Sequence, residues 1–130
     1  MLDPQTVADR YLAIWNETDA TRRRALLAQS WTETAAYADP LMRGRGADEV
    51  GALIEAVQMR FPGFRFAISG LADGHGDHVR FAWDLGPEGA EPVIKGTDFV
   101  RVDGDRIAEV IGFLDQVPAL LLIMPKPFQL

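Results

Sequence analysis

Three side chains, Tyr11, Asp39 and Asp98, are of the types that perform acid–base chemistry. Asp39 closes the stretch AAYADP and precedes Pro40, so it is either a local turn former or a general base at the mouth of a pocket. Asp98 is the single acid in an otherwise apolar set of alternating residues, Ile94, Gly96, Asp98, Val100 and Val102. A buried lone carboxyl must find a partner or keep its proton with a raised pKa.

The same periodicity argument places Tyr11 and Asp39 near Asp98. Tyr11 lies on the apolar stripe of a helix expected over residues 4–16, and Tyr37 shares a strand face with Asp39. Tyr11, Asp39 and Asp98 could therefore line one cavity. Each keeps a structural alternative: Tyr11 as a core residue, Asp39 as a turn residue, and Asp98 in a salt bridge to Arg80 or Arg101.

The elements that must position these residues follow from periodicity. Helices are predicted over 4–16, over about 20–29 with Leu26 and Leu27 inward and the run Arg22–Arg24 outward, and over about 50–61. RGRG (43–46) reads as a loop. From residue 63 the period changes to two, and turns at ADGHGD, GPEG and DGD divide the second half into an antiparallel meander. Helices followed by such a meander predict an α+β fold, in which one face of a curved sheet packs on helices.

Composition limits the protein class. With 130 residues, 48% of them hydrophobic, we expect one domain over residues 1–130, and the net charge of -6 argues against a nucleic-acid partner. Cysteine is absent, which excludes disulfides and thiolate chemistry. No stretch resembles a membrane span or a signal peptide, so we expect no membrane partner and a cytoplasmic location.

Motifs for metals and cofactors are weak or missing. His75 and His78 lie in ADGHGDH, where the glycines favour an exposed hairpin loop over a metal site. Neither a nucleotide-binding glycine fingerprint nor a serine nucleophile elbow occurs in the sequence. We therefore expect neither a metal nor a cofactor.

The order RYLAIWNETD, AAYADP, GTDFVRVDGDRI and GFLD resembles the nuclear transport factor 2-like superfamily, and within it the SnoaL-like and ketosteroid isomerase-like branch. The resemblance covers nearly the whole chain. It implies a cone-shaped (cystatin-like) α+β fold, with three helices packed on a strongly curved sheet that encloses an apolar pocket. It also implies a homodimer formed through the outer face of the sheet.

Steroid isomerases of this branch carry a tyrosine in an RY pair and aspartates in EDP and IDHF stretches, which match Tyr11, Asp39 and Asp98. By resemblance, Asp39 is the general base, while Tyr11 and a protonated Asp98 are donors to the developing oxyanion. Ketosteroid isomerase is itself the standard example of such carboxyl tuning. The pocket of such a fold is lined by bulky side chains, and here we expect Trp15, Tyr37, Met42, Ile54, Phe61, Phe81, Trp83 and Phe113.

Several departures from the family pattern shape the functional hypotheses. Polyketide cyclase-like and epoxide hydrolase-like members use an acid in the last strand, where EVIGFLD has Gly112, so those chemistries are disfavoured. Trp15 and Trp83 could narrow the pocket below steroid size. The apolar tail over about 118–130 is expected to be a lid over the pocket or an interface.

Two hypotheses remain open. The first is a cofactor-independent enzyme that shifts a proton next to a carbonyl in a small apolar substrate. The second is a protein that binds a small apolar molecule without turnover. A raised pKa of Asp98 favours the first, whereas an Asp98 paired with arginine and an Asp39 turned to solvent favour the second.

Overall fold

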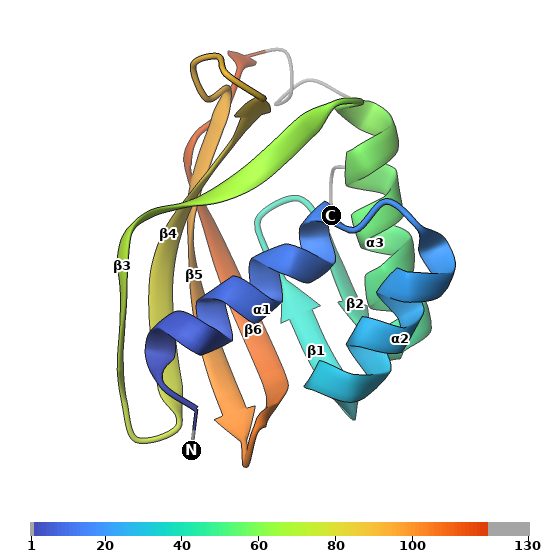
Figure 1. The fold of residues 1–130 in the computed structure, drawn as a ribbon, viewed down its shortest axis with the longest axis vertical. Helices are drawn as coiled ribbons and strands as arrows, with labels where there is room; N and C mark the ends of the chain where they lie inside the picture. The colour runs from blue at the N-terminus through green and yellow to red at the C-terminus, as the bar shows by residue number, and fades with distance from the viewer. Residues whose placement is uncertain (1, 120–130) are drawn as a thin grey trace.

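The computed structural model describes residues 2–119, which form three helices and a curved sheet of six strands (Figure 1). Most of the tail over 118–130, predicted to be a lid or an interface, lies outside the described residues. The elements in chain order are α1 (Pro4–Asn16), α2 (Ala20–Ser30), β1 (Trp31–Ala38), β2 (Arg43–Arg45), α3 (Gly46–Arg60), β3 (Phe64–His75), β4 (His78–Pro87), β5 (Ile94–Asp103) and β6 (Arg106–Gln116).

The first two helices begin at aspartate caps. The Asp3 carboxylate accepts a hydrogen bond from Thr6 N at 3.0 Å, and the Asp19 carboxylate accepts one from Arg22 N at 2.8 Å. Each cap satisfies a backbone N–H that has no partner within the helix. Helix α3 begins at Gly46, four residues before the first residue of its predicted apolar stripe.

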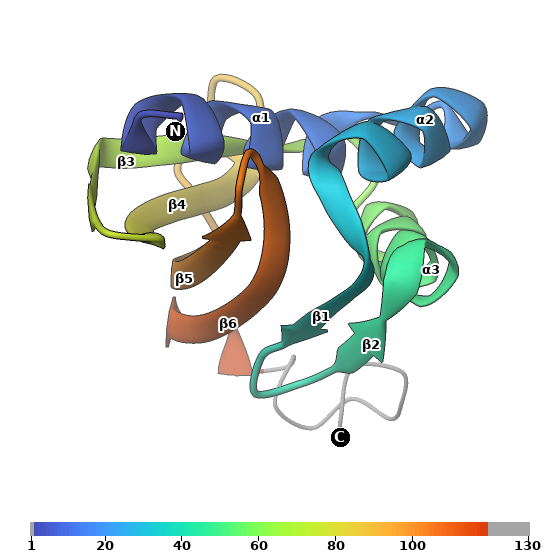
Figure 2. The same cartoon turned by 90° about the horizontal axis from the view of Figure 1, so that it is seen from below.

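The sheet has the order β2-β1-β6-β5-β4-β3, in which β1 runs parallel to β6 and all other neighbours are antiparallel. The meander predicted for the second half of the chain is therefore confirmed. Figure 2 shows the sheet curving from β3 to β2, with α1 lying across its inner side and α3 beside β1 and β2. The arrangement matches the predicted α+β fold, in which helices pack on one face of a curved sheet.

Three local predictions are wrong. RGRG contains the short strand β2, which pairs antiparallel with β1, instead of being only a loop. The turn predicted over 72–77 is shorter, because β3 continues to His75 and β4 starts at His78. Arg23 does not face solvent: it is 4% exposed and donates to the Glu17 carbonyl and to Gln58 Oε1. Hydrogen bonding to fixed acceptors offsets the cost of burying that guanidinium.

Strand parity correctly predicts which side of β5 faces the core. Ile94, Gly96, Asp98, Val100 and Val102 are buried, and their neighbours in sequence are more exposed. On the outer face Phe99, Ile111 and Phe113 remain accessible. Among residues 2–119, no helix is long and apolar enough to cross a membrane.

Candidate active site

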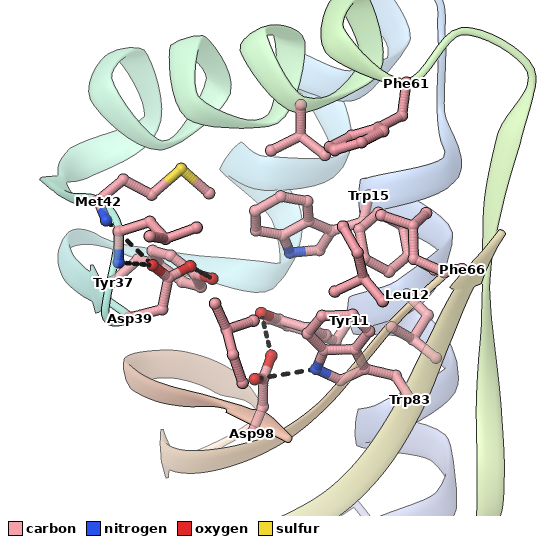
Figure 3. A pocket seen from close by; sticks show the side chains of 15 residues that line it. Tyr11, Leu12, Trp15, Tyr37, Asp39, Met42, Phe61, Phe66, Trp83 and Asp98 are labelled. Atoms are coloured by element: carbon pink, nitrogen blue, oxygen red, sulfur yellow. Dashed lines mark hydrogen bonds between the residues drawn. The ribbon is translucent and has the colours of Figure 1, made fainter. Parts of the chain in front are cut away.

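An apolar cavity of about 50 Å³ lies between the inner face of the sheet and helices α1 and α3. One enclosed water needs roughly 10–15 Å³, so the space is that of a small molecule and is far below the size of a steroid. Figure 3 shows the side chains around it. They are Tyr11, Leu12, Trp15, Tyr37, Asp39, Leu41, Met42, Val57, Phe61, Phe66, Trp83, Leu85, Ile94, Asp98 and Leu114.

Asp98 is held on the cavity wall by two long-range hydrogen bonds. The Tyr11 hydroxyl donates to Asp98 Oδ2 at 2.6 Å, and the Trp83 indole N–H donates to Oδ1 at 3.0 Å. The residue is 2% exposed. Its predicted alternative, a salt bridge, is not formed, because Arg80 pairs with Asp73 and Arg101 lies beside Glu109.

Gly96 allows Trp83 to reach Asp98. The two residues are register partners on β5 and β4, and a Cβ at position 96 would overlap the Trp83 ring. A glycine two residues before the acid is therefore a steric requirement for the indole to lie across the strand. The sequence GTD contains both the glycine that makes room for the indole and the acid that the indole contacts.

Asp39 is held mainly by its own turn. Its Oδ1 accepts hydrogen bonds from Leu41 N at 2.8 Å and Met42 N at 3.0 Å, while its Oδ2 accepts one from the Tyr37 hydroxyl at 2.6 Å. Asp39 therefore shapes the turn and also lines the cavity. A carboxylate offers about four lone-pair sites, so three donors leave one for another proton.

Burial perturbs the titration of all four of these polar groups. Desolvation raises the pKa of Asp98 to about 6, although the Tyr11 and Trp83 hydrogen bonds oppose the rise. Desolvation also raises the pKa of Asp39 above its ordinary value, opposed by the Tyr37 hydrogen bond and the two backbone donors. The pKa values of Tyr11 and Tyr37 are raised well above the ordinary value, chiefly by burial and then by the nearby Asp98 charge. Both phenols therefore stay protonated.

Gly112 lies next to both acids. It is the register partner of Asp98, and a Cβ there would lie 2.9 Å from Asp98 Oδ1 and 3.2 Å from the Asp39 Cβ. A larger residue would push against both acids. The missing side chain keeps the space between the two carboxyl groups open.

The structure places most of the predicted pocket residues on the cavity wall, but not all of them. Trp15, Tyr37, Met42, Phe61 and Trp83 line it together with the three acid–base candidates. Ile54 and Phe81 are buried in the core instead, and Phe81 packs edge-on against Tyr11 at a centroid distance of 5.3 Å. Phe113 lies on the outer face and is 52% exposed, because it alternates with the inward-facing Gly112 and Leu114.

Sequence reasoning missed several wall residues, namely Leu12, Leu41, Val57, Phe66, Leu85, Ile94 and Leu114. Phe66, Leu85 and Ile94 lie on strand faces that the alternation already marks as inward, so parity could have found them. The Trp83–Asp98 hydrogen bond has no comparable sequence signature. It depends on the register between β4 and β5.

Metal ligands do not gather within residues 2–119, where no group of three or more histidine or acidic side chains is placed to hold an ion. His75 and His78 are exposed register partners at the end of the β3–β4 hairpin. The arrangement at the cavity instead combines two carboxyls with hydroxyl and indole donors in apolar surroundings. Such a set can accept, hold and return a proton.

The fold and the site define a class of protein, which comparison with known families identifies. A family model for the SnoaL-like domain matches residues 8–110. The chain belongs to the SnoaL-like domain family, within the nuclear transport factor 2-like superfamily. No curated protein matches the chain significantly.

Solved structures agree with this assignment. A candidate isomerase of the SnoaL-like family from Agrobacterium tumefaciens is 47% identical, with a TM-score of 0.83 over 86% of this chain and 97% of that one. A protein from Catenulispora acidiphila with a ketosteroid isomerase-like fold, in complex with trimethylamine, is 17% identical (TM-score 0.73, 92% of each chain). A protein of the nuclear transport factor 2-like fold from Mesorhizobium loti is 18% identical (TM-score 0.64, 88% and 96%). The last two show likeness of fold alone.

Proposed function

We propose that the protein is a cofactor-independent, ketosteroid isomerase-like enzyme that shifts a proton next to a carbonyl in a small apolar substrate. Asp39 is the general base, and Tyr11 together with a protonated Asp98 provides donors for the carbonyl oxygen. The similarity to a candidate isomerase from Agrobacterium tumefaciens supports the reaction class. The small cavity volume favours a substrate below steroid size.

The observation that carries the proposal is the buried Asp98, which has no cationic partner among the described residues. Its two donors are a phenol and an indole, and burial holds its pKa near 6. A carboxyl used only for structure would more commonly be paired with an arginine or be exposed. A neutral carboxyl in an apolar cavity can instead donate a hydrogen bond to substrate.

The chemistry follows from the two acids. Ionised Asp39 takes a proton from the carbon next to the carbonyl, and the electron pair moves onto the carbonyl oxygen to give a dienolate. Donors on the Tyr11–Asp98 side stabilise that oxygen in apolar surroundings. Protonated Asp39 then returns the proton to the γ-carbon of the dienolate. The double bond has moved into conjugation, and the enzyme has regained its starting state.

A second candidate function is binding of a small apolar molecule without turnover. It is favoured by the local role of Asp39, whose carboxylate already receives three hydrogen bonds that stabilise the ionised form and weaken it as a base. The Catenulispora acidiphila protein in complex with trimethylamine is a relative in fold that holds a comparably small ligand.

Cyclase-like or hydrolase-like chemistry with an acid in the last strand gains no support from the site. At Gly112 a Cβ alone would press on Asp98 and Asp39. The space that such an acid would need is already bounded by the two other carboxyl residues.

The proposed function is tested by following the absorbance of a conjugated enone. Cyclohex-3-en-1-one is the small-ring probe for this reaction, and a β,γ-unsaturated 3-ketosteroid tests the larger size. We expect Asp39→Asn to lower kcat by about 10²- to 10⁴-fold, the usual contribution of a general base. Asparagine retains an acceptor for Leu41 N and Met42 N, so the turn survives.

The matched control is Asp73→Asn, an exposed acid that pairs with Arg80. It should leave the rate unchanged. Equal rates for the wild type and Asp39→Asn would reject Asp39 as the base. If the wild type converts neither ketone yet binds cyclohex-3-en-1-one, as judged from the fluorescence of the wall tryptophans, the second candidate function is favoured.

The expected homodimer is likewise a proposal. The outer sheet face that would form it exposes Phe99 and Phe113, whose rings are in edge contact at 5.7 Å, and Ile111 beside them. Analytical ultracentrifugation of the wild type and of Phe113→Arg tests it: the variant should be monomeric at concentrations where the wild type is dimeric. A wild type that sediments as a monomer would reject the proposed dimer.

A further inference from the structure

The hydrogen-bond donors on the cavity wall are almost all in use. Four lining side chains carry a hydroxyl or indole donor: Tyr11, Trp15, Tyr37 and Trp83. Tyr11 and Trp83 donate to Asp98, and Tyr37 donates to Asp39. Only the indole N–H of Trp15 has no hydrogen-bond partner among the described residues.

The unpaired Trp15 N–H is deeply buried, and the Trp15 ring packs beside both tyrosines that donate to the two acids. The residue is 4% exposed, and its ring packs against Tyr37 at 5.4 Å and Tyr11 at 6.2 Å between centroids. In Figure 3 the indole nitrogen is on the side of the ring that faces the Tyr11–Asp98 pair, away from α3. Buried donors without a partner are rare in native proteins, and one on the wall of a cavity calls for an acceptor in that cavity.

Tyr11 cannot serve as a free donor while Asp98 is ionised, because its single proton is then directed at the carboxylate. It becomes available only when Asp98 carries a proton of its own and donates to the Tyr11 oxygen or to the ligand. The indole N–H of Trp15 requires no such change, since indole is a donor in every state of the site. Trp15 is therefore the donor already prepared for a ligand.

We propose that Trp15 Nε1–H donates a hydrogen bond to the oxygen of the bound ligand, which is a small, ring-sized compound with a carbonyl or enolate-like oxygen. This inference rests on the proposed function in one respect only, namely the chemical type of the oxygen that the ligand carries. The acceptor lies beside the Tyr11–Asp98 pair, so Trp15 and Tyr11 hold one oxygen together once Asp98 is protonated. Trp15 thus becomes a determinant of specificity for ligands that contain oxygen over hydrocarbons of the same shape.

The rival explanation is that Trp15 acts only on Tyr11. The indole N–H approaches the Tyr11 oxygen closely enough to lower the pKa of that phenol slightly, although the contact does not have hydrogen-bond geometry. In that case a ligand oxygen would leave the Trp15 N–H unaffected. The chain also offers an internal comparison: the N–H of Trp31 is likewise buried and unpaired, but Trp31 does not line the cavity.

The direct test uses ¹⁵N-tryptophan-labelled full-length protein, which has three indole signals, one for each tryptophan in the chain. Phenol is the probe, because it is a small planar ring with an enolate-like oxygen, and toluene is the probe of matched shape without oxygen. We expect phenol to move the Trp15 indole proton downfield and toluene not to do so, while Trp31 stays in place with both. An unchanged Trp15 signal when phenol is bound, or no phenol binding at all, would overturn the proposal.

Affinities from calorimetry provide the second test. Trp15→Phe should weaken phenol binding by about three- to tenfold, the value of one neutral hydrogen bond, and should change toluene binding by less than about twofold. Trp31→Phe removes an equally buried N–H that does not line the cavity and should leave both affinities unchanged. Equal weakening of phenol and toluene by Trp15→Phe would show that only packing was lost, and would contradict the hydrogen bond.

These binding tests separate the inference from the proposed function. Phenol binding through Trp15 in a protein that converts no ketone would retain the inference and reject the enzyme. Isomerase activity that Trp15→Phe leaves unchanged, combined with an unmoved Trp15 signal, would retain the enzyme and reject the inference.

Discussion

The cavity has two tyrosine–aspartate pairs, Tyr11–Asp98 and Tyr37–Asp39, with the same hydrogen-bond length of 2.6 Å. The two aspartates differ in how deeply they are buried and in the donors that surround them. Asp98 is buried in the sheet, and its hydrogen-bond donors, Tyr11 and Trp83, come from the separate elements α1 and β4. Asp39 lies at the end of β1 and is held by backbone groups within three residues of itself. Backbone N–H donors stabilise a carboxylate, whereas burial opposes ionisation.

The comparison explains how two identical side chains can take different roles. Asp98 has more burial and fewer donors, so it is suited to remain protonated at mildly acidic pH. Asp39 has three donors and less burial, so it is suited to ionise first and act as the base. Pairs of titratable groups whose environments separate their pKa values are typical of acid–base sites.

The largest expected effect distinguishes the two tyrosines. Tyr11→Phe removes a donor on the oxyanion side and should lower kcat for cyclohex-3-en-1-one by about 10²- to 10³-fold. Tyr37→Phe only frees one lone pair of Asp39 and raises the pKa of that acid, so we expect a change below about tenfold. Steady-state kinetics of both variants measure the difference. Equal losses would mean that the two pairs are functionally equivalent.

Stability should respond to Asp98 in a way that depends on pH. Its pKa is about 6 in the folded protein against an ordinary value of 3.8, so the folded state binds the proton more tightly. Its contribution to stability is therefore greatest below pH 3.8 and is lost as pH rises through about 6. We therefore compare the change in the free energy of unfolding that Asp98→Asn causes at two pH values. This change should be more stabilising at pH 8 than at pH 4 by on the order of 2–3 kcal/mol. Urea denaturation at both pH values measures this change, and an effect that does not depend on pH would contradict the raised pKa of Asp98.

A smaller effect is expected in the dependence of kcat/KM on pH. If neutral Asp98 is a donor, kcat/KM should fall about tenfold per unit as the pH rises above about 6, because the free enzyme loses that proton. The falling limb should disappear in Asp98→Asn, whose side chain donates at every pH. A falling limb that persists unchanged in this variant would assign it to another group.

The sequence predicted the helices and the inward face of β5 because amphipathic periodicity and strand alternation are local properties. The convergence of Tyr11, Asp39 and Asp98 on one cavity also followed, from parity together with the family resemblance. Parity would have placed Phe113 outside as well, had it been applied to β6.

The features that sequence reasoning missed depend on contacts between distant segments. The burial of Arg23 depends on acceptors in the loop after α1 and in α3, which no pattern around residue 23 reveals. The Trp83–Asp98 bond depends on strand register, and the unpaired N–H of Trp15 depends on what its neighbours donate to. A donor can be recognised as unpaired only when the positions of all side chains around the cavity are known.

The most direct test of the central claim is a ¹³C NMR titration of the aspartate carboxyl groups, with Asp98→Asn and Asp39→Asn used to assign the signals. We predict that Asp98 titrates near pH 6 and that Asp39 titrates at a lower pH, so that an ionised base and a protonated acid coexist between the two values. An Asp98 that titrates near its ordinary value of 3.8, or below Asp39, would contradict the division of roles proposed for the two pairs.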